Sequence, residues 1–338
     1  MAGLGSSDAS AAVIGPSRPV DGRHRRTAVI LDAMPRSIRS VQPIPPLPIA
    51  LTAASVSTAG PAAEAPPAQP SAAMQLSSTE VIIEGSGAES VVMIHGWPDT
   101  HRLWDAQVDA LKATCRCVRF TLPGFDLAKP EHACSLDEVV DAVRRIVEQT
   151  CPGERVTLLL HDWGCVFGYQ FANRHPQLVK RVIGVDVGDA GSRRNMAELS
   201  FRAKLMIVAY QWWLALAWRL GGSLGDRMAR WMARLLRAPA PPQDIGAAMG
   251  YPYAVQWFGV KGGFRALHPF DPQVPMLFFY GERKPFMFHS TAWREKLAAR
   301  PGNRVIGLPT GHWVMVQRPK EFNDAVLAWL AETDEVRS

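Results

Sequence analysis

The sequence predicts an α/β fold, in which a mostly parallel β-sheet is flanked by helices and interrupted by a helical insertion. Short apolar runs alternate with amphipathic stretches from residue 80 to residue 189, and the same rhythm returns at residue 276. This alternation is typical of βαβ units in a parallel sheet. Residues 190–272 lose the rhythm and have helical character. We therefore expect a core of residues 74–189 and 273–338, with residues 190–272 inserted as a helical cap.

The predicted strands are short apolar runs that end in turn residues. They are Glu80–Ile83, Ser90–Ile94, Arg116–Thr121, Val156–Leu160, Lys180–Val187, Met276–Tyr280 and Arg304–Leu308. The predicted core helices have apolar residues every three to four positions. They are Leu103–Leu111, Leu136–Thr150, a stretch that ends near Arg174, and Pro319–Leu330. Ser135 is the expected N-cap of the Leu136–Thr150 helix.

The first 73 residues differ from the rest of the chain. They are rich in Ala, Pro and Ser, and proline runs such as residues 43–48 cannot hold a helix or a central strand. We expect a disordered extension here, with Met74 as an alternative start of the chain. Scattered arginines and few acidic residues leave organelle targeting open.

The insertion begins with a long apolar stretch, Leu205–Leu220, and continues with a second helix at Arg227–Leu236. The apolar stretch is short for a membrane span and has arginine and lysine on its flanks. A buried helix is the expected structure. Weak contact of the cap with a membrane surface is the alternative.

The composition, with 47% hydrophobic and 20% charged residues among 338, is that of an ordinary globular protein. The formal net charge of +6 is spread along the chain and no basic motif is interleaved with aromatic residues, so a nucleic-acid partner is not expected. The five cysteines lack a disulfide spacing, which favours reduced thiols in a cytoplasmic protein. Neither a glycine-rich phosphate loop nor a metal-ligand cluster is visible, so no cofactor is expected. The sequence does not indicate an oligomeric state.

The most informative stretch is residues 156–169, where an apolar strand turns directly into a helix through His161-Asp162-Trp163-Gly164. Such a corner holds Asp162 against free backbone N–H groups and the positive end of the helix. Hydrolases often carry a serine at this corner, whereas an aspartate suits attack on an sp³ carbon with formation of an ester. The alternative is that Asp162 only caps the helix.

Three motifs follow one another along the chain: His95-Gly96-Trp97-Pro98, the Asp162 corner, and Gly311-His312-Trp313. Together they resemble the α/β-hydrolase superfamily, and within it the branch of epoxide hydrolases and haloalkane dehalogenases. The resemblance covers the chain from about Thr79 to the C-terminus. It implies the α/β-hydrolase fold with an inserted cap.

The resemblance also implies a role for each of these motifs. Asp162 would attack the substrate carbon, and His312 would activate the water that hydrolyses the resulting ester. The backbone N–H groups of Trp97 and Trp163 would form the oxyanion hole for that hydrolysis.

The acid partner of the histidine departs from the family pattern. The family often places this acid after the penultimate strand, in a motif like Tyr-Gly-x-x-Asp, and here Lys284 stands at that position. A lysine cannot orient an imidazole N–H. Some dehalogenases carry the acid at the end of the strand after the nucleophile helix. The expected acid is therefore Asp186, with Asp189 and Glu282 as alternatives.

Hydrogen-bond donors above the nucleophile separate the two enzymes of this branch. In epoxide hydrolases two cap tyrosines protonate the opening oxygen, and the cap here offers Tyr210, Tyr251 and Tyr253 as substrate-binding candidates. In haloalkane dehalogenases N–H donors stabilise the halide. Trp163 supplies one donor, but Trp97 stands where the family frequently has asparagine. The His95-Gly96-Trp97-Pro98 motif favours epoxide hydrolysis, with haloalkane dehalogenation as the alternative.

A third interpretation belongs to another class of protein. Lys284 would then mark a family member that kept the fold, lost efficient turnover and serves as a binding protein. A carboxylate within reach of His312 would argue against it. In either enzyme, the tryptophans and aliphatic residues of the cap indicate a small apolar substrate.

Overall fold

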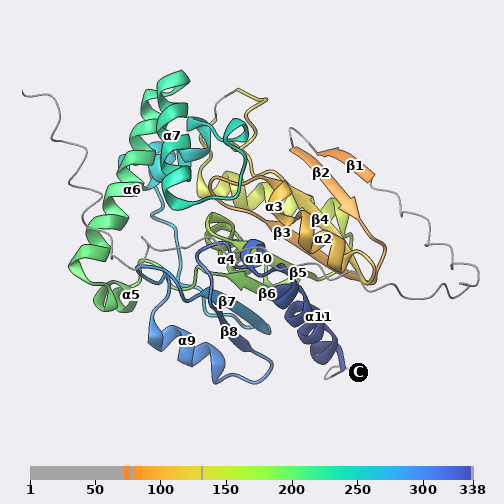
Figure 1. Ribbon diagram of the computed structural model, residues 1–338. Coiled ribbons are helices and arrows are strands. Elements are labelled where there is room, and N and C mark those ends of the chain that lie inside the picture. The colour runs from red at the N-terminus through yellow and green to blue at the C-terminus, as the bar shows by residue number, and fades with distance from the viewer. Residues whose placement is uncertain (1–71, 77–78, 131, 336–338) are drawn as a thin grey trace, which may run out of the picture. The chain divides into compact units, whose positions relative to one another are not determined.

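A computed structural model describes residues 72–76, 79–130 and 132–335 (Figure 1). Their strands form one eight-stranded sheet with the order β1-β2-β4-β3-β5-β6-β7-β8. β1 and β2 are antiparallel to their neighbours, whereas the pairs from β4 to β8 are parallel. The strands are β1 Ala72–Leu76, β2 Thr79–Glu84, β3 Glu89–Ile94, β4 Cys115–Phe120, β5 Val156–His161, β6 Val179–Val185, β7 Met276–Gly281 and β8 Arg304–Leu308. The predicted, mostly parallel sheet is confirmed.

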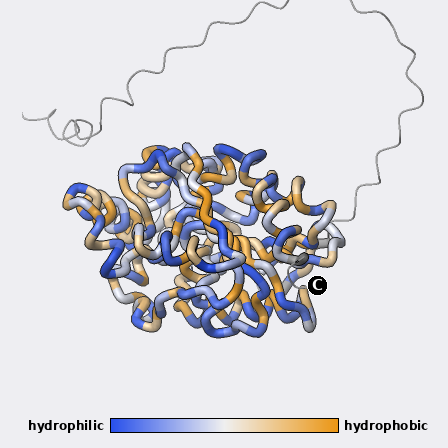
Figure 2. Tube along the Cα trace, turned by 90° about the horizontal axis from the view of Figure 1, so that it is seen from below, coloured by the Kyte–Doolittle hydropathy of each residue, from blue (hydrophilic) through white to orange (hydrophobic). Residues whose placement is uncertain are grey.

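Helices cover both faces of this sheet (Figure 1). In the described ranges they are η2 His101–Trp104, α2 Asp105–Leu111, α3 Leu136–Thr150, α4 Trp163–Arg174, η3 Pro176–Leu178, α5 Arg193–Glu198, α6 Phe201–Leu220, α7 Gly222–Leu236, η4 Pro242–Asp244, η5 Ala247–Gly250, α8 Tyr251–Phe258, η6 Val260–Gly262, α9 Thr291–Ala298, α10 Val314–Gln317 and α11 Pro319–Glu335. Successive strand residues point to opposite faces. Val91 therefore packs with α2 and α11, whereas Val92 packs with α3 and α4. Hydrophobic stretches cross the middle of the trace in Figure 2.

The N-terminal boundary differs slightly from the prediction, because β1 begins at Ala72 rather than after residue 73. The predicted disordered extension otherwise lies outside the described residues. The N-cap of α3 is confirmed. The Ser135 side chain accepts from the Glu138 N–H, and the Glu138 carboxylate accepts from the Ser135 N–H. All five cysteines are buried free thiols.

The chain leaves the sheet after β6 and forms α5 to η6 before it returns in β7. We call residues 193–262 the helical insertion. The prediction that its apolar helix is buried is wrong for one side of α6. Leu214 and Ala215 are buried where α6 packs against α7 and α8, but Phe201, Leu205 and Trp212 are exposed, because these neighbours cover only one side. No helix in the described part of the chain has both the length and the apolar character to cross a membrane.

Candidate active site

Asp162 stands at the corner between β5 and α4, with backbone angles of φ 53° and ψ −122°. A positive φ is unfavourable for a residue with a side chain and is typical of functional corners. The corner also requires glycine. A Cβ on Gly164 would lie 2.1 Å from the Ile94 carbonyl oxygen, and a Cβ on Gly96 would lie 2.3 Å from an Asp162 carboxylate oxygen. The loop after β3 is therefore in direct contact with the Asp162 carboxylate.

Backbone donors surround this carboxylate. The Trp97 N–H donates to Asp162 Oδ1 at 2.8 Å. Burial favours the neutral acid, but the hydrogen bond and charge of His312, together with the Trp163 N–H, hold the pKa of Asp162 below its ordinary value. The geometry thus keeps Asp162 ionised, and it brings the two N–H groups predicted for an oxyanion hole to the same carboxylate.

His312 follows β8 and lies between two carboxylates. Its Nε2 is 3.4 Å from Asp162 Oδ2, and its Nδ1 is 2.5 Å from Asp186 Oδ2. Burial alone would lower the pKa of His312, but the hydrogen bonds and charges of these two carboxylates raise it to about 9. The ring of His161 packs 4.5 Å from the His312 ring, and its Nε2 donates to the His312 carbonyl oxygen at 3.2 Å. Main chain and side chain of His312 are therefore both held in place.

The structure describes all three acid candidates, and of these Asp186 is hydrogen-bonded to His312. It follows β6 with a positive φ of 70°, and it is fully buried. Asp189 instead accepts from the backbone N–H of Ser290 at 2.6 Å and from its hydroxyl at 2.7 Å. The side chain of Glu282 is exposed. The geometry therefore supports Asp186 over the other two.

Lys284 forms a buried ion pair with Asp186 Oδ1, and the Gly281 N–H donates to the same oxygen at 2.9 Å. The side chain of Lys284 is only 6% exposed and that of Asp186 is 0% exposed. Burial favours the neutral acid, but the Lys284 charge and the His312 hydrogen bond hold the pKa of Asp186 below its ordinary value. Sequence reasoning identified Lys284 as a departure from the family but missed this contact. The feature of the sequence that could have indicated this contact is a lysine, Lys284, at the position where the family usually has its acid.

Two tyrosines of the helical insertion lie near Asp162. The rings of Tyr210 in α6 and Tyr253 in α8 are 6.1 Å apart, and the Tyr253 ring lies 5.3 Å from Trp163 and 6.1 Å from Trp97. Burial raises the pKa of both hydroxyls, and the negative charge of Asp162 acts on each in the same direction. The structure thus brings two of the three candidate tyrosines to the corner.

The structure does not bring Tyr251 to this site, which corrects that part of the prediction. Tyr251 packs against Phe125, with a ring separation of 5.6 Å, and against Gly124. The charges that act on its hydroxyl are those of Cys134 and Glu138 rather than of the nucleophile. The physical reason is helix geometry, because residues two apart on a helix do not share a face.

Two further buried side chains support the loop after β3. His95 Nε2 accepts from the Leu122 N–H at 2.9 Å, so its Nδ1 donates to the Gly96 carbonyl oxygen at 3.0 Å. Burial lowers the pKa of His95 to about 4, which suits a neutral brace. Asp99 accepts from Trp313 Nε1 at 2.8 Å, and burial raises the pKa of Asp99 to about 7. Sequence reasoning gave Asp99 no role, although it directly follows the loop motif.

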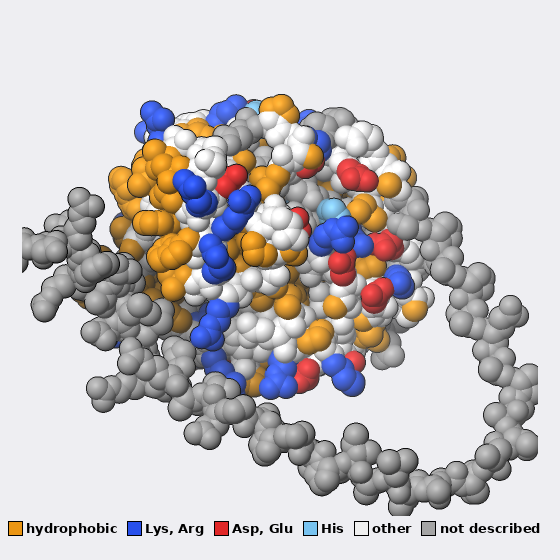
Figure 3. Space-filling view, turned by 45° about the horizontal axis from the view of Figure 1, so that its top comes forward, with side chains coloured by type: hydrophobic (Ala, Val, Ile, Leu, Met, Phe, Trp, Pro, Cys, Tyr) orange, Lys and Arg blue, Asp and Glu red, His pale blue; other side chains and the backbone are white. Residues whose placement is uncertain are grey.

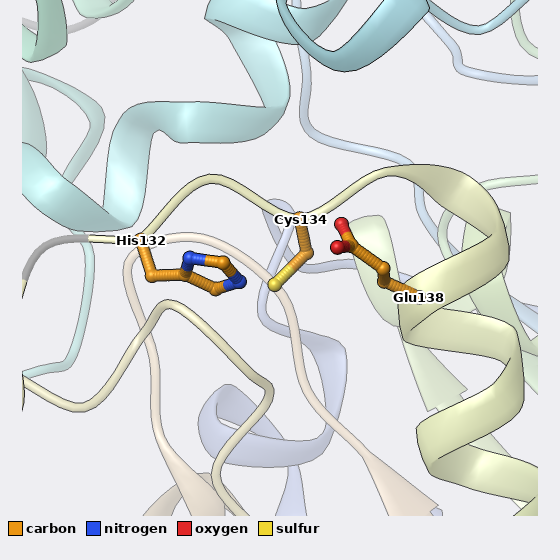
Figure 4. A group of neighbouring side chains, drawn as sticks. All are labelled: His132, Cys134 and Glu138. Atoms are coloured by element: carbon orange, nitrogen blue, oxygen red, sulfur yellow. The ribbon is translucent and has the colours of Figure 1, made fainter.

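A group outside this site offers donor atoms of the kind that bind metals. Single ligand atoms of His132, Cys134 and Glu138 lie within 4.8 Å of one another (Figure 4). The Glu138 oxygens are already engaged, one with the Ser135 N–H at 2.7 Å and the other with Lys261 Nζ at 3.4 Å. Burial raises the pKa of the Cys134 thiol to about 11. Helix capping and the contact with Lys261 account for Glu138, and we assign no metal to the group.

A family model described as "Alpha/beta hydrolase family" matches residues 91–325. The chain belongs to this family. A mutant epoxide hydrolase of Bacillus megaterium with its diol product has a TM-score of 0.60 at 20% identity, covering 77% of this chain and 100% of that one. A haloalkane dehalogenase loop variant from Bradyrhizobium elkanii has a TM-score of 0.55 at 16% identity, covering 79% and 98%. At these identities the likeness shows the fold alone.

Curated relatives match shorter stretches of this α/β-hydrolase. "Epoxide hydrolase 1" of Caenorhabditis elegans is 29% identical over 127 residues, which is 36% of this chain and 31% of that protein. A "Cis-3-alkyl-4-alkyloxetan-2-one decarboxylase" of Shewanella oneidensis is 33% identical over 111 residues, which is 32% of this chain and 35% of that protein. The chain thus spans about a third of these relatives' length. The predicted α/β-hydrolase fold and family are confirmed.

Proposed function

We propose that this α/β-hydrolase is an epoxide hydrolase, which opens a small apolar epoxide through an ester on Asp162. One arrangement supports the proposal: the Asp162 carboxylate contacts His312, and Tyr253, which is buried, and Tyr210, which is half-buried, lie beside it from the helical insertion. In this proposal the helical insertion is the cap that supplies the tyrosines. Asp162, His312 and Asp186 are the catalytic residues.

In the first step an Asp162 oxygen attacks a ring carbon, and the carbon–oxygen bond of the epoxide breaks. Asp162 can attack because it is ionised, as the direction of its pKa indicates. The released oxygen takes a proton from Tyr210 or Tyr253. An opening epoxide oxygen develops toward an alkoxide, a stronger base than a phenolate. A tyrosine whose pKa is raised by burial can therefore still protonate it.

In the second step water attacks the ester carbonyl carbon and His312 Nε2 takes one proton of the water. The bond between that carbon and the alcohol oxygen then breaks, and the other proton of the water passes to this oxygen, which completes the diol and leaves Asp162 ionised.

With a pKa raised to about 9, His312 is protonated at neutral pH while Asp162 is ionised. Esterification neutralises Asp162 and so removes one of the two carboxylates that raise this pKa. His312 can then give up its proton, which restores the tyrosine hydroxyl used in ring opening, and is a neutral base when water attacks. Asp186 stabilises the imidazolium that forms again. The N–H groups of Trp97 and Trp163 stabilise the oxyanion.

Haloalkane dehalogenation is the second candidate, and one observation favours it. The Trp97 indole N–H is buried and has no hydrogen-bond partner among the described residues. A buried donor without a partner is unfavourable unless a ligand satisfies it, and a leaving halide could accept from this group. The decarboxylase relatives add a further strained ring, the oxetanone, to the substrates that need testing.

The test is single-turnover mass spectrometry of the His312→Gln variant with epoxides, haloalkanes and oxetanones. Without the base the ester should accumulate, so we expect an adduct of epoxide mass on the peptide that contains Asp162, and none in an Asp162→Asn control. An adduct from haloalkanes alone would favour the dehalogenase. The absence of any adduct in folded protein would contradict an enzyme of this mechanism and favour the binding-protein interpretation.

The tyrosines give a sharper test, because the chain offers a matched control. Tyr210→Phe and Tyr253→Phe should each slow ring opening by about 100-fold, the usual contribution of a general acid. Tyr251→Phe removes a hydroxyl that is buried like that of Tyr253 but does not lie at Asp162, so it should leave the rate within a few-fold. Equal effects of all three substitutions would contradict the assignment of the proton donors.

A further inference from the structure

The helical insertion exposes an unusual number of large apolar side chains. On α6 they recur every three to four residues and so form one stripe, and α7 carries a shorter stripe. We call these residues the α6–α7 face: Phe201, Leu205, Val208, Trp212, Leu216 and Leu220 of α6, with Leu224, Trp231 and Leu235 of α7. Phe201 is 82% exposed, Leu205 58% and Trp212 47%. Soluble proteins seldom expose apolar surface in such continuous groups unless it binds something.

Basic side chains accompany this face. Figure 3 shows apolar side chains gathered over the helical insertion, at the left of the view, with lysine and arginine side chains alongside. The basic residues of α6 and α7 are Arg202, Lys204, Arg219, Arg227, Arg230 and Arg234. The two helices contain one acidic residue, Asp226, which pairs with Arg230 at 3.7 Å. The surface is therefore apolar and positively charged at once.

A hollow borders the face where α6 meets α8. Its volume is about 710 Å³, and it is lined by Trp218, Arg219, Phe258 and Val260. The Trp212 ring contacts the Phe258 ring at 5.4 Å, which joins the hollow to the apolar stripe of α6. An apolar hollow with one guanidinium at its edge has the chemistry to receive part of an amphiphile.

We propose that the α6–α7 face docks the protein on the surface of an anionic lipid bilayer. Apolar side chains on one helix face enter the boundary between headgroups and acyl chains, while the flanking arginines pair with lipid phosphates. A second copy is the poorer occupant, because a two-fold interface would bring the basic surfaces of both copies together, with Asp226 as the one acidic residue that α6 and α7 of each copy supply. Docking would bring the helical insertion close to apolar compounds dissolved in the bilayer.

The test is flotation of the full chain with vesicles of phosphatidylcholine and phosphatidylglycerol, compared with phosphatidylcholine alone. We expect binding to the anionic vesicles, weaker binding to the neutral ones, and loss of binding as salt rises. A Leu205→Gln, Leu216→Gln double variant should bind at least tenfold more weakly. The matched control changes Leu267 and Val316, which are both 39% exposed and lie outside the face, to glutamine and should bind as the parent does.

Charge is tested by Arg227→Glu and Arg234→Glu, each of which should weaken binding by at least about fivefold. Quenching of tryptophan fluorescence by brominated lipid should accompany binding, because Trp212 and Trp231 lie on the face. Failure of the full chain to float with anionic vesicles at low salt would overturn the proposal. So would equal binding by the face and control variants, or a dimer that the Leu205→Gln, Leu216→Gln substitutions dissociate. None of these measurements uses catalysis, so the result does not depend on the proposed reaction.

Discussion

The ion pair of Lys284 with Asp186 provides the most specific prediction, since it occurs at the position where the family usually has its acid. The Lys284→Met substitution keeps an unbranched side chain that is one atom shorter, and it removes the charge. Asp186 then retains His312 and the Gly281 N–H as partners, but loses the cation on Oδ1. Removal of one partner from a buried ion pair costs about 3 to 5 kcal/mol. Because His312 remains, we expect a loss of about 3 kcal/mol in the free energy of unfolding at neutral pH.

The same substitution should raise the pKa of His312. Lys284 Nζ and His312 Nδ1 contact the two oxygens of one carboxylate, so they are separated by at most about 7 Å. A positive charge at that distance, with an effective dielectric constant of about 20 to 40, disfavours the imidazolium by roughly 1 to 2 pKa units. Without Lys284, His312 should hold its proton to higher pH, and ester hydrolysis should need a correspondingly higher pH.

The assay combines chemical denaturation with an NMR titration of His312, whose signal is assigned by its absence in His312→Gln. The matched control is Lys296→Met, which breaks the pair with Asp271, where the side chains are 54% and 48% exposed. An exposed pair of this kind contributes at most about 1 kcal/mol. If Lys284→Met costs no more than Lys296→Met and leaves the His312 titration unchanged, Asp186 does not depend on Lys284 and the reasoning is refuted.

Three further predictions concern the same region. The pKa of Asp99 is raised from 3.8 to about 7 in the folded protein, so the folded protein binds more protons than the unfolded chain between these pH values. The free energy of unfolding should therefore fall as pH rises from about 4 to 7. Asp99→Asn can still accept from Trp313, and thermal melts of this variant should lack the fall. The folded-state pKa of His312 is raised from 6.5 to about 9, so its contribution is complete below 6.5 and is lost as pH rises through 9; denaturation curves of His312→Gln should lack this decline. Gly96→Ala would place a Cβ 2.3 Å from an Asp162 oxygen, so ester formation should fall at least tenfold, and an unchanged rate would contradict the described contact.

Local features of this enzyme could be predicted because the chain itself encodes them over a few residues. The apolar run before Asp162 and the glycine at 164 determine a strand that turns into a helix, and Ser135 with Glu138 determines the start of α3. The expectation of Asp186 came from the resemblance to dehalogenases that carry the acid after this strand, and it agrees with the fact that the carboxyl ends of parallel strands meet at one edge of the sheet. Of the two antiparallel strands, β2 was predicted as Glu80–Ile83, whereas nothing in the sequence before Thr79 indicated β1.

Other features depended on contacts between residues far apart in the chain. The pairing of Lys284 with Asp186 spans 98 positions, and that of His312 with Asp186 spans 126. Tyr251 and Tyr253 stand two positions apart in one short aromatic stretch, and only the rotation of α8 against the core places Tyr253 near Asp162. The sequence by itself determined the strands from β2 to β8, the order of the main elements and the Asp162 corner, because hydrogen bonding and apolar periodicity act locally. The tertiary structure decided which charges meet and which side of α6 is left exposed, because both depend on how distant elements pack.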